Sequence, residues 1–235
     1  MAVHRDLEGG AADGAVVSGG WLRPGTLDTV LELNECSLAL LAEQGLARGR
    51  TACPLLRQVA ELWCMLEPKA RHRAANCPYL LLDAGFADPA RWRVCPQGQV
   101  GDNAPLAYAA FFTVPAAAEV ARLIFTYAWH LARAEPPAAR LLLGMPAASA
   151  TLIGGYSLRQ IQVLAERRLD WLHPRWPARV EVWRDLLLAA AAGEGPALER
   201  ARLRGLTLLA AETCQASARS VGPGTIDRGQ TTGAV

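Results

Sequence analysis

Arginine and glutamine side chains recur along one side of the segment 157–169, SLRQIQVLAERRL. Ser157 is a residue type that commonly caps the start of a helix. In a helix, Leu158, Ile161 and Leu164 form an apolar stripe that faces a core. The polar side then carries five candidate contact residues, Arg159, Gln160, Gln162, Arg167 and Arg168. Arginine and glutamine form bidentate hydrogen bonds with guanine and adenine edges, so the pattern predicts contact with DNA.

A short apolar segment, MPAASATLIGG, precedes this helix. We expect Gly154 and Gly155 to supply the positive φ that a tight turn needs. Thr151 then offers a small residue for close approach between two helices. With Ser157 as cap and Ile161 as core anchor, the spacing predicts a helix-turn-helix-like unit over 145–169.

Charge gives this unit modest support. Six arginines and three acidic residues occur within 157–184, a net charge of +3, whereas the whole chain carries +2. Neutralising several phosphates would require these arginines on one face. The alternative, an ordinary solvated helix surface, fits the same pattern and stays open.

Other chemistry has weaker signals. The six cysteines include no C-x-x-C pair, which favours buried structural thiols over a zinc site, and no phosphate-binding glycine motif occurs. Cys77 and Asp83 could act in catalysis only if other groups approached them in space, and Asp88 followed by Pro89 is typical of a helix cap. We therefore expect no catalytic residues, no cofactor and no metal site.

Three tryptophans, Trp171, Trp176 and Trp183, either stack on bases or cover a core edge, and the apolar composition favours the core.

The elements that must position these residues are helical. Hydrophobic residues make up 51% of the 235 residues, and charged residues 20%, which favours a folded globular chain. Apolar periodicity predicts a helix over 27–44, and prolines mark further helix starts or breaks at Pro54, Pro68 and Pro115. The stretch 77–86 is ambiguous between a strand and a buried helix. With about eight to ten helices and no confident strand, the class is all-α, an orthogonal multi-helix bundle.

The chain divides, on composition, into a flexible arm over 1–24, a helical half over 25–105, a second helical half over 106–218 and a disordered tail over 219–235. The loop at 95–105 is the expected boundary between the halves. No internal repeat is evident. No apolar run is as long as a membrane span and the N-terminus has no apolar signal region, so we expect a cytoplasmic protein without membrane contact.

Two segments resemble the FlhD-type flagellar transcriptional activators. The stretch 138–169 has the family's order of features, which here are Leu143-Gly144, Leu152-Ile153, Ser157-Leu158 and Leu164-Ala165. The stretch 31–44 resembles the family's first helix through Leu33-Asn34 and Leu40-Leu41-Ala42. The resemblance implies an all-α dimeric activator that binds promoter DNA together with a second regulatory subunit. In that family the two segments are nearly adjacent, whereas here the insertion 46–137 separates them.

Two functions therefore stay open. One is a DNA-binding transcriptional regulator that uses the helix at 157–169. The other is an all-α protein–protein interaction or scaffold module, homodimeric or not, with an exposed apolar surface in a region such as 27–41 or 198–209.

Overall fold

The all-α prediction is confirmed by the structure, a computed structural model that describes residues 22–23, 25–46, 53–93 and 111–220. These residues form eleven α-helices, a single turn of 3-10 helix and two strands of two residues each. Within this described part, no single helix is long and apolar enough to cross a membrane. Two neighbouring helices, Pro136–Leu143 and Ala147–Gly155, are long and apolar enough for a membrane span only when taken together. The angle between them is 119°.

The first half contains, in chain order, α1 (Thr26–Leu46), α2 (Pro54–Gln58), α3 (Ala60–Met65), α4 (Pro68–Ala75), β1 (Leu82–Asp83) and α5 (Pro89–Trp92). Pro54 occupies a first-turn position, as predicted, because a missing N–H costs nothing there. Pro68, predicted as a break in the preceding helix, also begins a helix of its own. The ambiguous stretch 77–86 is neither a helix nor a full strand but extended chain with β1 inside it. The Asp88 cap is confirmed, since its side chain accepts hydrogen bonds from Ala90 N and Arg91 N.

The second half contains α6 (Ala116–Ala134), α7 (Pro136–Leu143), α8 (Ala147–Gly155), α9 (Leu158–Arg167), the 3-10 turn η1 (Leu169–Trp171), β2 (His173–Pro174) and α10 (Val180–Ala192). The last helix, α11 (Gly195–Ser220), follows Gly193, whose φ of +72° is the left-handed conformation that commonly ends a helix. Arg219 and Ser220 belong to α11, so the predicted start of the tail at 219 was wrong.

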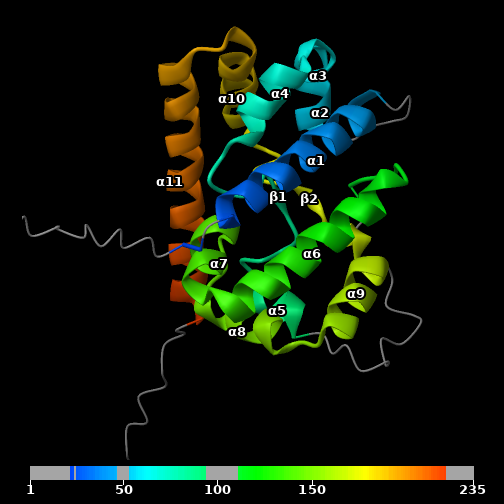
Figure 1. The fold of residues 1–235 in the computed structure, drawn as a ribbon, viewed down its shortest axis with the longest axis vertical. Coiled ribbons are helices and arrows are strands. Elements are labelled where there is room, and N and C mark those ends of the chain that lie inside the picture. The colour runs from blue at the N-terminus through cyan, green and yellow to red at the C-terminus, as the bar shows by residue number, and fades with distance from the viewer. Residues whose placement is uncertain (1–21, 24, 47–52, 94–110, 221–235) are drawn as a thin grey trace, which may run out of the picture.

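The two halves share one hydrophobic core. Helices α1 and α6 pack against each other at its centre, and β1 pairs with β2 antiparallel beside them (Figure 1). Helix α5, the last of the first half, packs onto α8, and α10 of the second half packs onto α2, α3 and α4. Helix α11 lies along α10 and reaches α7. The predicted boundary loop at 95–105, nearly all of the N-terminal arm and the tail from 221 onward lie outside the described residues.

Candidate nucleic-acid interface

The predicted helix at 157–169 exists as α9, and its start is fixed by a reciprocal capping box. Ser157 N donates to Gln160 Oε1 at 2.8 Å, and Gln160 N donates to Ser157 Oγ at 3.3 Å. Ile161 and Leu164 are buried where α9 packs on α6. Leu158, expected on the buried stripe, is instead 42% exposed.

The turn before α9 differs from the prediction. Gly154 and Gly155 both belong to helix α8, and neither has a positive φ. Gly154 is instead required for close packing, since a Cβ there would lie 3.2 Å from Ala132 O on α6. Thr151 is exposed and hydrogen-bonds within its own helix, so it does not face a partner helix. Helices α8 and α9 each pack mainly on α6, which therefore supports both sides of the corner.

Three of the five candidate contact residues reach solvent. Arg159, Gln162 and Arg167 are exposed, and neither arginine forms an ion pair within the described residues. Gln160 is half-buried and occupied by the capping box. Arg168 ends the helix, where its Nη2 lies 3.1 Å from Asp170 Oδ2 and its guanidinium lies 4.8 Å from the centre of the Trp171 ring.

Two further arginines lie near α9 that the sequence pattern did not single out. The Arg91 guanidinium, from α5, lies 5.8 Å from the same Trp171 ring that Arg168 approaches. Arg133, at the end of α6, is exposed, lies over Trp129 and approaches the Gly154 backbone beside the corner. No local signal could identify them, because each lies in another helix and only the fold brings it close.

The tryptophans belong to the core, as favoured from the composition. Trp171 packs against Trp92 with ring centres 5.2 Å apart and against Phe125 at 6.3 Å. Trp176 and Trp183 are also buried. None of the three presents a ring face on which a base could stack.

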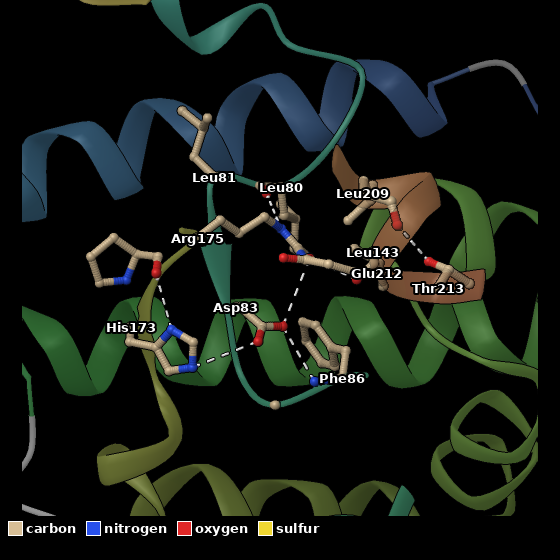
Figure 2. Close-up of polar contacts among 12 residues, drawn as sticks. Leu80, Leu81, Asp83, Phe86, Leu143, His173, Arg175, Leu209, Glu212 and Thr213 are labelled. Atoms are coloured by element: carbon tan, nitrogen blue, oxygen red, sulfur yellow. Dashed lines mark hydrogen bonds and ion pairs between the residues drawn. The ribbon is translucent and has the colours of Figure 1, made fainter. Parts of the chain in front are cut away.

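Arg175, counted from sequence among the cations of a DNA footprint, is 4% exposed and holds the fold together. Its Nε donates to Leu80 O and its Nη2 to Leu143 O, both at 2.6 Å (Figure 2). Its Nη2 also lies 3.8 Å from Asp83 Oδ1, and Asp83 Oδ2 lies 3.6 Å from His173 Nε2. Arg175 therefore cannot reach a phosphate, and the net charge of 157–184 overstates its accessible positive charge.

A polar cleft of about 740 Å³ lies beside this cluster, between the β1–α5 segment and α11, and Asp83 and Glu212 line it. Glu212 accepts a hydrogen bond from Trp176 Nε1 at 2.8 Å. Its pKa is raised because burial penalises the carboxylate more than Arg175 and Trp176 favour it. Asp83 is held on several sides, by Phe86 N as well as by Arg175 and His173, so its role in the structure is to anchor the turn.

Cys77, the other residue considered for catalysis, lines a different hollow, beside Leu27 and Leu203. Burial raises the pKa of its thiol to about 11, which leaves almost no thiolate at neutral pH. Cys77 and Asp83 thus do not converge on one site. Within the described ranges, no group of three or more histidine, cysteine or acidic side chains is placed to hold a metal ion.

No family model matches this sequence, no curated protein matches it, and no solved structure matches its fold.

Proposed function

We propose that this chain is a DNA-binding transcriptional regulator that contacts the duplex through the exposed side of α9. One observation carries the proposal: the side chains of Arg159, Gln162 and Arg167 are exposed and unpaired within the described residues, on a helix that the rest of the fold holds in place. The capping box holds the start of α9, and burial of Ile161 and Leu164 against α6 holds its length. Rigid presentation of free guanidinium and amide groups is what groove contact requires.

Neighbouring charges refine the proposal. Arg133 adds a cation beside the start of α9. Glu166 is exposed one turn beyond Gln162 and places a carboxylate on the same side of the helix. DNA binding through this surface is therefore weakened by Glu166 and strengthened by the arginines around it. The resemblance of 138–169 to FlhD-type activators points to the same class of ligand.

The test is a binding series with pooled genomic DNA fragments at about 50 and 200 mM salt, measured by mobility shift. The double variant Arg159→Ala, Arg167→Ala should weaken binding. It should also reduce the slope of log affinity against log salt by the amount expected for the loss of up to about two phosphate contacts. Glu166→Gln should strengthen binding. The matched control is Arg57→Ala with Arg200→Ala, which removes the same charge from exposed sites on α2 and α11. If both double variants lost the same amount of DNA affinity, or if the unaltered chain did not bind DNA, α9 would be rejected as the contact surface.

A second candidate function, self-association as an interaction module, is favoured by one observation. Leu203 is 59% exposed on α11 and Leu141 is 46% exposed on α7. Two adjoining hollows of about 320 and 230 Å³ meet at Leu206, so the apolar surface is continuous along α11. Leu203, Leu206 and Ala210 lie at helical spacing on α11, and the same row on a second copy would complement it about a two-fold axis.

Sedimentation equilibrium of the full chain tests this candidate. A dimer that Leu203→Asp converts to a monomer would support it, with Leu188→Asp as a control at an exposed leucine on α10. A chain that stays monomeric at the highest soluble concentration would exclude it.

A further inference from the structure

Two stretches of the chain, 91 positions apart, have the same backbone course. Residues 82–92 and 173–183 each form a two-residue strand, a turn and the start of a helix. Each turn contains a residue with positive φ, Gly85 at +72° and Trp176 at +48°. The backbone bond that closes each turn is also the same, Asp88 N to Gly85 O at 3.1 Å and Arg179 N to Trp176 O at 2.9 Å.

Each copy ends in a buried tryptophan that donates its ring N–H to a carbonyl of its own turn. Trp92 Nε1 donates to Gly85 O at 3.1 Å, and Trp183 Nε1 donates to Arg175 O at 2.7 Å. The two acceptors are neighbouring positions and not the same one, since Arg175 matches Ala84. Both copies nevertheless share the strand, the turn with its positive φ and a buried tryptophan bonded back to that turn, which a chance similarity of two turns does not explain.

Two pairs of helices have nearly the same spacing. Helices α1 and α6 begin 90 positions apart, at Thr26 and Ala116, and α4 and α9 also begin 90 positions apart, at Pro68 and Leu158. In each half the long first helix packs on the three helices that follow it, and the next helix, α5 or α10, crosses to the other half. The strands pair antiparallel, with Leu82 opposite Pro174 and Asp83 opposite His173. Because Leu82 matches His173 and Asp83 matches Pro174, an approximate two-fold axis between these two residue pairs exchanges them and produces the antiparallel pairing.

We infer that the chain is an internal duplication, in which α4 is the counterpart of α9 and offers a second contact point for the same polyanionic ligand. This inference departs from the prediction that the chain has no internal repeat. In Figure 1, α4 and α9 lie at opposite ends of the molecule with β1 and β2 between them. Within the part of the chain that the structure describes, helix α11 has no counterpart in the first half.

The equivalence pairs Lys69 with Arg159, each the second residue of its helix. Both side chains are exposed, and neither forms an ion pair within the described residues. Helix α10 covers another side of α4, where Arg73 Nε donates to Ala190 O at 2.8 Å, and leaves Lys69 open. A two-fold rotation preserves height along its axis, so it would place Lys69 and Arg159 at the same height on opposite sides of the axis. A DNA duplex lying across that axis would meet both.

This inference rests on the proposed DNA binding, and the only lysine of the sequence makes it testable. Limited acetylation of the full chain, read by mass spectrometry, should modify Lys69 several-fold more slowly when a DNA duplex is bound. The N-terminal amine serves as the internal reference. Lys69→Gln should reduce the salt slope of duplex binding by about 0.9, and so should Arg159→Ala, whereas Arg57→Gln on the exposed side of α2 should not.

The outcomes separate the two proposals. If Arg159→Ala weakens binding while Lys69→Gln has no effect and bound duplex leaves Lys69 acetylation unchanged, the second contact is refuted and the α9 proposal stands. If the unaltered chain does not bind duplex at either salt concentration, both are refuted.

Discussion

Replacing Asn34 by leucine should destabilise the whole fold, because this buried amide on α1 hydrogen-bonds the extended segment that leads into β1. Its Nδ2 donates to Tyr79 O at 2.9 Å and to Ala75 O at 3.0 Å, and its Oδ1 accepts from Leu81 N at 2.8 Å. Leucine has the same branching and the same number of side-chain heavy atoms but no polar atom, so Tyr79 O and Leu81 N would stay buried without partners. Each orphaned backbone group costs about 1–3 kcal/mol, so the expected loss in free energy of unfolding is about 2–6 kcal/mol.

Urea unfolding followed by tryptophan fluorescence measures this loss, and Ser37→Ala is the matched control. Ser37 is equally buried on the same helix, but its hydroxyl donates only to Leu33 O within α1, at 2.6 Å. Because Leu33 O keeps its helical partner, the control should lose only about 0.5–1.5 kcal/mol. If Asn34→Leu proved no less stable than Ser37→Ala, the amide would not be the bridge between α1 and β1.

Three further predictions concern single side chains. Gly144→Ala should lower the free energy of unfolding by about 1–3 kcal/mol, measured in urea, because its φ is +69° and a Cβ would lie 2.5 Å from Leu209 Cδ1; an unchanged midpoint would contradict this. Cys77, with its pKa raised to about 11 by burial, should be alkylated in the native state at least about tenfold more slowly than exposed Cys36, a difference that should vanish in denaturant. The raised pKa of Glu212 means that the folded state holds its proton more tightly, so this contribution to stability is present at acid pH and lost as pH rises through the folded pKa. Glu212→Gln, which keeps an acceptor for Trp176 Nε1, should therefore flatten the fall in melting temperature from acid to neutral pH, and an unaltered pH profile would count against it.

Local sequence signals located several helix ends correctly, because those ends depend on a few adjacent residues. Proline at first-turn positions, Asp88 as a cap and Gly193 after α10 each act within one turn of helix. The same local logic predicted α9 and its cap at Ser157. The sequence also contained a signal that the prediction did not use. Serine followed three residues later by glutamine is a capping-box pattern, which engages the Gln160 side chain in hydrogen bonds at the start of the helix.

Contacts across the fold corrected the rest of the candidate site. Arg175 is as cationic as Arg159 in the sequence, yet the carbonyls of Leu80 and Leu143 hold it in the core. Arg91 reaches the Trp171 ring from a helix far away in the chain. Periodicity describes which side of a helix is apolar, but it does not say which other segment meets each polar side chain.

The internal duplication shows most clearly which features depend on local sequence and which depend on the tertiary structure. In the matched stretches 82–92 and 173–183, only an alanine and the final tryptophan are identical in the two copies, so the sequence by itself determined helices and caps but not the repeat. Gly85 and Trp176 occupy the same left-handed backbone position, although one has no side chain and the other has the largest. Backbone course and hydrogen bonding can be kept while side chains diverge, because the two copies pack against different neighbours. Only the tertiary structure therefore decided which helices are equivalent and which cations face solvent together.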